Sequence, residues 1–131
     1  MNLKLNKKIK LGSKVIDHNS KPYLIGEVSC NHNGEIANAK KLILTAKKFG
    51  ADYIAFGSFF KSLTKKTIFK ANLEILRWSK KKINIPTVAI GGINSSNYKK
   101  ILSTGSDFIA CSNYIWNNKK LDPVKAIKKF R

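Results

Sequence analysis

The chain has 131 residues, and its 26 Lys and Arg against 7 Asp and Glu give it a formal net charge of +19. This length suits one domain and is too short for a complete eight-stranded βα barrel, which takes about 200 residues or more. Hydrophobic residues make up 43% of the chain, which is enough to build a core and excludes a disordered basic tail.

From residue 23 onward, short apolar runs alternate with longer segments of helical period. The runs predict strands over 23–28, 53–56, 85–90 and 108–111. The segments between them predict helices over 35–48, near 71–82, from a serine cap at Ser95–Ser96, and from Asp122–Pro123. We expect the last helix to bury Val124, Ile127 and Phe130. The predicted fold class is α/β, a (βα)4 partial barrel with a parallel sheet and its helices outside.

Residues 1–22 differ from the rest and form a basic segment. Within it, 9–16 is expected to make a short hairpin that caps one end of the sheet, while residues 23–131 form the single (βα)4 domain. An internal repeat supports this pattern, since 49–55 matches 104–110 at an offset of 55 residues. In each copy a glycine follows a helix and an aspartate precedes a strand.

Ligands bind beyond the carboxyl ends of the strands in parallel α/β sheets. Gly91–Gly92 follows the third strand, and it either lets backbone N–H groups approach a ligand or simply makes a tight turn. Ser62, Thr64 and Lys65 supply two hydroxyl groups and one ammonium after the second strand, and Ser112 follows the fourth. We expect these three loops to converge on a phosphate group.

A metal centre is not predicted. His18 and His32 lie on different segments and have no pair of carboxylates nearby. Cys30 and Cys111 are too few for a disulfide scaffold, lack Cys-x-x-Cys spacing, and are expected to be buried structural thiols. No apolar run has the length of a signal sequence or a membrane span, so we expect a cytoplasmic protein that does not engage a membrane.

Residues from about 50 to 131 resemble the end of thiamine-phosphate synthases. The resemblance is carried by GADYIAFG at 50–57, SLTK at 62–65, VAIGGI at 88–93 and GSDFIA at 105–110. That family is a (βα)8 barrel that joins a hydroxymethylpyrimidine pyrophosphate to a thiazole phosphate and releases pyrophosphate. Lys61 stands where the family usually has proline, and Ser62 stands where threonine is more common.

This resemblance implies roles for several residues. Ser62, Thr64, Gly91 or Gly92, and Ser112 would hold the thiazole phosphate. Lys65 would be catalytic, because a fixed cation facing the departing pyrophosphate stabilises its developing charge. The family also implies Mg²⁺, but its magnesium-binding aspartates lie on earlier strands that have no counterpart in this chain.

Residues from about 9 to 54 resemble instead the start of sialic-acid (N-acetylneuraminate) synthases. The resemblance is carried by PYLIGE at 22–27, NHNG at 31–34 and AKKLI at 39–43. That family, also a (βα)8 barrel, condenses phosphoenolpyruvate with an amino sugar, and Glu27 and His32 would lie at the barrel mouth. Its usual Lys-Phe-Gln is replaced by residues 55–57, and its later metal-binding histidines are missing. The two resemblances meet near 50–52, which indicates a natural fusion, a decaying gene or an assembly artefact.

Together these patterns predict a thiamine-phosphate-synthase-like protein that keeps a phosphate subsite although half of the barrel is missing. A homodimer would restore eight strands. Two alternatives stay open. One is a sialic-acid-synthase-like fragment, which is favoured if Glu27 and His32 line a pocket with Lys65. The other is a non-catalytic basic domain that binds nucleic acid or another polyanion, but no nucleic-acid recognition motif appears.

Overall fold

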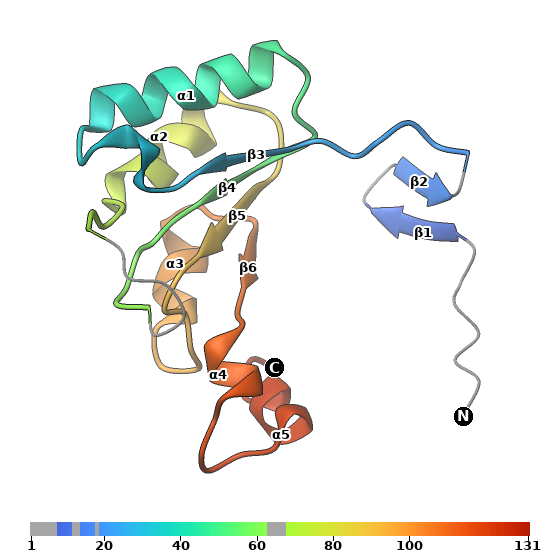
Figure 1. The fold of residues 1–131 in the computed structure, drawn as a ribbon, viewed down its shortest axis with the longest axis vertical. Coiled ribbons are helices and arrows are strands. Elements are labelled where there is room, and N and C mark those ends of the chain that lie inside the picture. The colour runs from blue at the N-terminus through green and yellow to red at the C-terminus, as the bar shows by residue number, and fades with distance from the viewer. Residues whose placement is uncertain (1–7, 12–13, 18, 63–67) are drawn as a thin grey trace.

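The computed structural model describes residues 8–11, 14–17, 19–62 and 68–131 (Figure 1). Its centre is one parallel sheet whose four strands are paired in chain order: β3 (Ile25–Val28), β4 (Tyr53–Phe56), β5 (Thr87–Ile90) and β6 (Phe108–Ala110). The predicted strands are therefore present, two of them starting two residues later than expected. The expected α/β fold with a parallel four-stranded sheet is confirmed.

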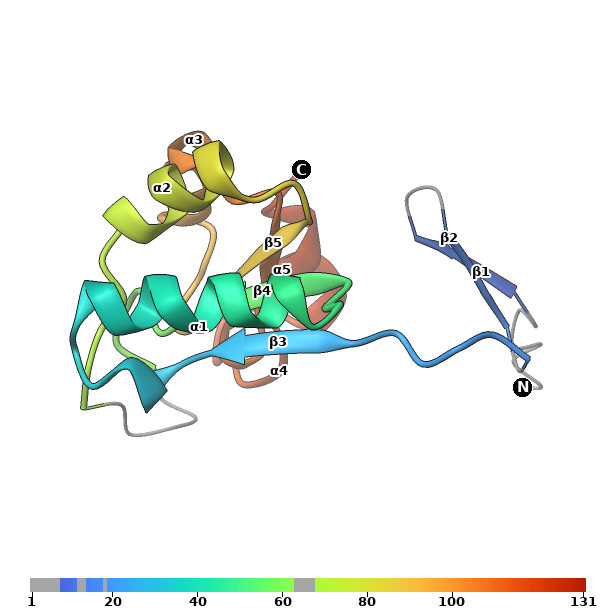
Figure 2. The same ribbon diagram turned by 90° about the horizontal axis from the view of Figure 1, so that it is seen from above.

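Three helices connect the strands and lie on one side of the sheet (Figures 1 and 2). They are α1 (Ile36–Lys48), α2 (Glu74–Lys82) and α3 (Tyr98–Thr104). Their apolar faces build the core against the strands, and its largest fully buried apolar side chains are Ile43, Ile54, Phe56, Leu76 and Ile101. Burial of this surface is the main source of stability.

The two faces of the sheet differ in what covers them. Side chains alternate along a strand, so Ile54 and Phe56 point toward the helices and are 0% and 1% exposed. The register aligns Glu27, Ala55, Val88 and Phe108 on the opposite face. No described helix covers that face, and Phe108 is 58% exposed there. The sheet therefore has one covered face and one open face.

The third helix begins later than its serines suggest. The predicted start was Ser95–Ser96, but α3 begins at Tyr98, after an N-cap at Asn97. The Ser95 hydroxyl hydrogen-bonds the Tyr114 hydroxyl at 2.7 Å, and the Ser96 hydroxyl donates to Asn94 Oδ1 at 2.6 Å. Neither hydroxyl group therefore caps the helix, because that of Ser95 bonds a distant tyrosine and that of Ser96 bonds a residue of the same loop.

The segment after β6 contains two short helices, α4 (Asn113–Trp116) and α5 (Pro123–Lys128). The first lies where we expected a loop. The second begins as predicted, and the Asp122 carboxylate accepts the Lys125 N–H at 2.9 Å. The expected burial of Val124 and Ile127 is wrong, because α5 packs through Ala126 and leaves those two side chains 62% and 42% exposed.

Phe130 is the apolar residue that anchors this carboxyl-terminal segment. Its ring lies edge-on to the rings of Tyr98 and Tyr114, with centroid distances of 5.1 and 5.4 Å. These contacts join the last turn of the chain to α3 and α4, so Phe130 is partly buried as expected.

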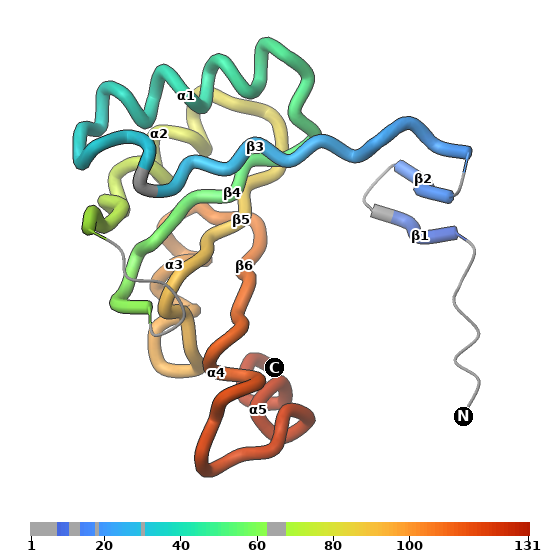
Figure 3. Tube along the Cα trace, viewed as in Figure 1, coloured from blue at the N-terminus to red at the C-terminus, as the bar shows by residue number. Residues whose placement is uncertain are grey.

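The amino-terminal segment forms the expected hairpin from β1 (Lys8–Leu11) and β2 (Lys14–Asp17), which pair antiparallel. An extended connector places it beyond the amino end of β3, and Figure 3 shows that its trace does not lie across the sheet. Its contact with the sheet runs through Lys14, whose ammonium pairs with the Asp52 carboxylate. Ile9 and Val15 are more than half exposed, so this two-stranded element buries too little apolar surface to cover an end of the sheet.

The internal repeat marks the same turn at two places. Asp52 and Leu24 exchange two hydrogen bonds, since the Asp52 N–H donates to the Leu24 carbonyl and the Asp52 carboxylate accepts the Leu24 N–H, both at 2.8 Å. Asp107 and Thr87 repeat this exchange at 3.2 and 2.9 Å. Each aspartate thus links the start of its own strand to the start of the neighbouring strand by hydrogen bonds.

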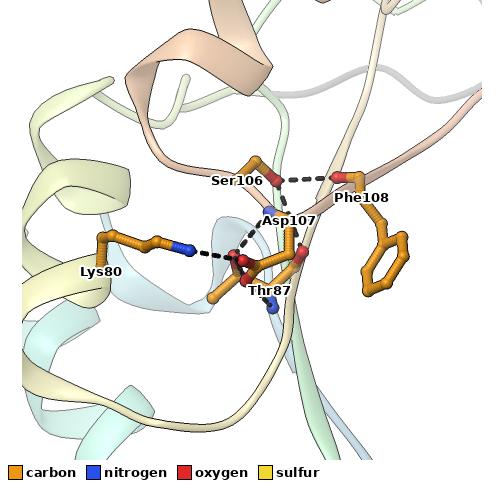
Figure 4. Close-up of polar contacts among 5 residues, drawn as sticks. All are labelled: Lys80, Thr87, Ser106, Asp107 and Phe108. Atoms are coloured by element: carbon orange, nitrogen blue, oxygen red, sulfur yellow. Dashed lines mark hydrogen bonds and ion pairs between the residues drawn. The ribbon is translucent and has the colours of Figure 1, made fainter. Parts of the chain in front are cut away.

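Asp107 makes more hydrogen bonds than Asp52 does (Figure 4). The Asp107 carboxylate also accepts the Thr87 hydroxyl at 2.9 Å and the Lys80 ammonium at 2.7 Å. Burial alone would raise the pKa of Asp107, but these hydrogen bonds outweigh it and hold the pKa below its ordinary value. The carboxylate is therefore charged in the folded protein at neutral pH.

The turn after β5 is shaped by two glycines with positive φ, Gly91 at 89° and Gly92 at 66°. The segment after β4 packs directly on them, and the Phe60 N–H donates to the Gly91 carbonyl at 3.2 Å. A Cβ on Gly91 would lie 2.7 Å from the Ser58 Cα, and one on Gly92 would lie 2.8 Å from the Phe60 carbonyl carbon. Only glycine permits both the backbone conformation and this approach.

Replacing Asp107 with alanine should lower the free energy of unfolding by about 1–3 kcal/mol, because the buried Thr87 N–H loses its acceptor. Asp107→Asn keeps an acceptor and should cost less. Because the pKa of Asp107 is lowered in the folded protein, the stabilisation by its carboxylate is fully present above the unfolded-state pKa of about 3.9. This stabilisation is lost as the pH falls through the folded-state pKa. Urea unfolding at a series of pH values should show a weaker acid dependence for Asp107→Asn, and an unchanged dependence would contradict the role of the carboxylate.

Replacing Gly91 with alanine should destabilise the fold by strain and by steric overlap. Gly50 is the matched control, because its φ is 84° but no atom lies within 4 Å of a Cβ placed there. Gly50→Ala should cost only the conformational strain, about 1–2 kcal/mol. Gly91→Ala should cost about 1–3 kcal/mol more, measured by chemical denaturation. Equal losses for the two variants would show that the contact with Ser58 is not tight.

Candidate phosphate-binding site at the carboxyl ends of the strands

A cavity of about 300 Å³ lies where the carboxyl ends of the parallel strands meet. Its walls come from the ends of β3, β5 and β6 and from the loops that follow the strands. The lining residues are Glu27, Ser29, Ser58, Ser62, Ile90, Gly91, Ala110, Cys111, Ser112 and Asn113. Strands with one direction bring the loops after them to one edge of the sheet, so residues far apart in the sequence meet here.

Three of the residues selected from the sequence share this cavity. Ser62 reaches it from the loop after β4, Gly91 from the turn after β5, and Ser112 from the start of α4. Gly92 lies outside the lining, and its carbonyl accepts the Asn97 side-chain amide at 3.1 Å. The expected convergence of three loops is thus present for Ser62, Gly91 and Ser112, while their role toward phosphate stays a prediction.

Two further site predictions, Thr64 and Lys65, lie outside the described residues. The segment that contains them directly follows Ser62, which lines the cavity. Their assignment as a phosphate ligand and as the catalytic cation therefore stays a prediction.

The cavity also contains hydroxyl groups that the sequence analysis did not single out. Ser29 directly follows β3, and its N–H is bound by the Asn31 side chain at 3.0 Å. Ser58 follows β4, and its hydroxyl donates to the Phe60 carbonyl at 2.6 Å. A simple signal was available for both, because each comes within two residues of the carboxyl end of a predicted strand.

The cavity walls carry several serine hydroxyl groups but little charge. Glu27 is the only carboxylate among the lining residues, and the Cys111 thiol has its pKa raised by burial. A thiol with a raised pKa is a poor nucleophile at neutral pH. Hydrogen-bond donors gathered on several loops suit a phosphate or another oxyanion.

The described residues do not fit a magnesium site. No group of three His, Cys, Asp or Glu side chains among them is arranged to hold a metal ion, and Mg²⁺ requires oxygen ligands such as carboxylates.

His32 lines a different cavity from Glu27. It is part of a short 3₁₀ turn, η1 (Cys30–His32), which directs the ring inward so that it is 5% exposed. Its Nδ1 accepts the Gly34 N–H at 3.1 Å, while Nε2 has no partner among the described residues. It lines a separate cavity of about 40 Å³ together with Lys70 and Asn72. Glu27 and His32 thus line different cavities, and their place at a barrel mouth stays a prediction.

Comparison with known proteins gives one consistent family. The family model for thiamine monophosphate synthase matches residues 14–115. A thiamine-phosphate synthase from Pelagibacter ubique (strain HTCC1062) is 49% identical over 104 residues, which cover 79% of this chain and 47% of the relative. One from Nitrosospira multiformis is 43% identical over 89 residues, covering 68% of this chain and 36% of the relative. The chain thus spans less than half the length of these curated relatives.

Solved structures agree. The thiamine phosphate pyrophosphorylase from Pyrococcus furiosus superposes with a TM-score of 0.58 at 38% identity and covers 70% of this chain and 42% of that one. A geranylgeranylglyceryl phosphate synthase from Thermoplasma acidophilum has a TM-score of 0.56 at 19% identity, covers 74% of this chain and 37% of that one, and shows likeness of fold alone. None of the helices in the described part of the chain is long and apolar enough to cross a membrane.

The expected junction between two families is not supported. The matching family model begins at residue 14 and continues through the turn at 50–52 without a break, so one family accounts for both segments. Among the described residues, Glu27 and His32 line different cavities, so the condition that favoured a sialic-acid synthase is not met there. From residue 14 to residue 115, on sequence and on structure, the chain belongs to the thiamine monophosphate synthase family.

Proposed function

We propose that residues 23–131 form one half of a (βα)8 barrel and that the cavity at the carboxyl ends of the strands binds the thiazole phosphate of a thiamine-phosphate synthase. The observation that carries this proposal is the convergence of Ser62, Gly91 and Ser112 on one cavity. Family membership supports the reaction class, which joins a hydroxymethylpyrimidine pyrophosphate to a thiazole phosphate and releases pyrophosphate.

The phosphate is held by groups that come from different loops. Ser112 makes no capping hydrogen bond to α4, so its hydroxyl can donate to a ligand oxygen. Gly91 lines the cavity with backbone atoms alone, because Ser58 packs where a side chain would lie. Ser62 and Thr64 add hydroxyl groups from the loop after β4. Donors fixed on separate rigid elements bind an anion without a large cost in ordering.

Lys65 supplies the positive charge of the reaction. Bond formation at the pyrimidine methylene carbon breaks its bond to pyrophosphate, and negative charge grows on the departing oxygen. An ammonium held near that oxygen stabilises the charge. Groups that grip the pyrimidine pyrophosphate, and the family's magnesium ligands, belong to strands with no counterpart in these four, so this half supplies the thiazole-phosphate side of the site.

Thiazole phosphate should bind to the 131-residue chain in a calorimetric titration, and the unphosphorylated thiazole alcohol should bind much more weakly. Ser112→Ala removes a hydrogen bond to a charged group, worth about 1.5–3 kcal/mol, so affinity should fall about tenfold or more. Thr64→Ala and Lys65→Ala should also weaken binding.

Ser103→Ala is the matched control for the serine variant. Its hydroxyl is exposed on α3 and donates to the Lys100 carbonyl at 3.1 Å, so it does not belong to the cavity. Binding should be unchanged in this variant. Absence of binding at millimolar ligand, or an equal loss for Ser103→Ala and Ser112→Ala, would overturn the assignment of the cavity.

A further inference from the structure

Glu27 is the acidic residue of the candidate site. It stands next to the last residue of β3, and the strand register places it on the same face of the sheet as Ile90 and Ala110. All three residues line the cavity of about 300 Å³ at the carboxyl ends of the strands. The cavity therefore has a carboxylate in its wall.

This carboxylate has no partner within the described part of the chain. The chain has seven acidic residues against 26 basic ones, and the other six acidic side chains each accept a hydrogen bond or pair with a lysine. Those six are Asp17, Glu35, Asp52, Glu74, Asp107 and Asp122. Glu27 accepts the Asn31 side-chain amide at 3.4 Å through its backbone carbonyl, which leaves the carboxylate available to a ligand.

The charge of Glu27 is not neutralised by the cavity wall. No lysine or arginine is among the lining residues that the structure describes, although the chain as a whole carries +19. A concave wall with a single negative charge attracts a cationic group.

The carboxylate and the proposed phosphate ligands come from different strands. Ser62 follows β4, Gly91 follows β5 and Ser112 follows β6, whereas Glu27 belongs to β3. Neighbouring strands lie about 4.8 Å apart, so β3 and β5 are separated by about 10 Å. The cavity therefore suits a ligand that is anionic at one end and cationic at the other.

The reaction under Proposed function makes such a molecule. The thiazole nitrogen shares its lone pair with the methylene carbon of the pyrimidine, and the electron pair of the breaking carbon–oxygen bond leaves with pyrophosphate. No proton is released, so the neutral thiazole becomes a thiazolium ring with one positive charge. The product thus carries a phosphate on its ethyl chain and a cation in its ring.

We propose that the Glu27 carboxylate stabilises the positive charge that develops on the thiazole ring, an inference that rests on the proposed function. The substrate lacks this charge, so the attraction strengthens as the new bond forms and favours the transition state over the bound substrate. Before the bond forms, the carboxylate repels the phosphate of the substrate. Glu27 therefore discriminates between the neutral and the cationic ring.

The test compares two ligands that differ by one charge on the ring. Thiazole phosphate and its N-methyl thiazolium derivative are each titrated into the 131-residue chain by calorimetry. Glu27→Gln keeps the shape of the side chain and removes its charge, so it should weaken binding of the thiazolium and slightly strengthen binding of the neutral thiazole. The affinity for the thiazolium relative to the thiazole should fall about tenfold, because opposite charges in contact attract even near solvent.

Glu35→Gln is the matched control, because it removes the same charge outside the cavity. Glu35 is exposed, and its carboxylate accepts the Asn38 side-chain amide at 3.1 Å. The relative affinity in this variant should equal that of the unchanged chain. Ser112→Ala should weaken both ligands equally, because both carry the phosphate.

An unchanged relative affinity in Glu27→Gln, or an equal fall in Glu35→Gln, would overturn the role of Glu27 and leave the phosphate site in place. If neither ligand binds the unchanged chain, the proposed function fails and the role of Glu27 fails with it. Binding by the unchanged chain therefore distinguishes the two failures.

Discussion

The close approach between the turn after β5 and the segment after β4 is the constraint on which the candidate site depends. Gly91 has positive φ and no room for a side chain beside Ser58. This packing brings the loop after β4 over the end of β5, and Ser62 then reaches the same cavity as Gly91 and Ser112. Both glycines are therefore required by the packing, and Gly91 is also a candidate binding residue.

Two aspartates fix the opposite end of the sheet, where the strands begin. Asp52 and Asp107 each bind a backbone N–H of the neighbouring strand, and this sets the amino ends of β3–β4 and β5–β6. The core lies on one side only, between the sheet and α1, α2 and α3. The parallel sheet is thus held by hydrogen bonds at the amino ends of its strands, and the candidate site lies at their carboxyl ends.

Much of the site was accessible from the sequence because parallel strands place their following loops at one edge. Ser62, Gly91 and Ser112 were found by that rule. Ser29 and Ser58 obey the same rule, but a serine after a strand is a common residue without a distinctive pattern. His32 could not be placed, because the short 3₁₀ turn that directs its ring inward has no clear periodic signal. The early start expected for α3 was wrong because the hydroxyls of Ser95 and Ser96 bond Tyr114 and Asn94 instead of capping the helix.

The sequence by itself determined the order of strands and helices, the parallel sheet and the turns at the repeated Gly-x-Asp, because apolar periodicity and turn chemistry are local properties. It also carried a true resemblance to thiamine-phosphate synthases, although a second resemblance divided the chain where one family continues. The tertiary structure decided which hydroxyls share a cavity, that Glu27 and His32 line different cavities, and that one face of the sheet is open. Those are properties of contacts between distant residues, and they depend on packing that no single segment of the sequence contains.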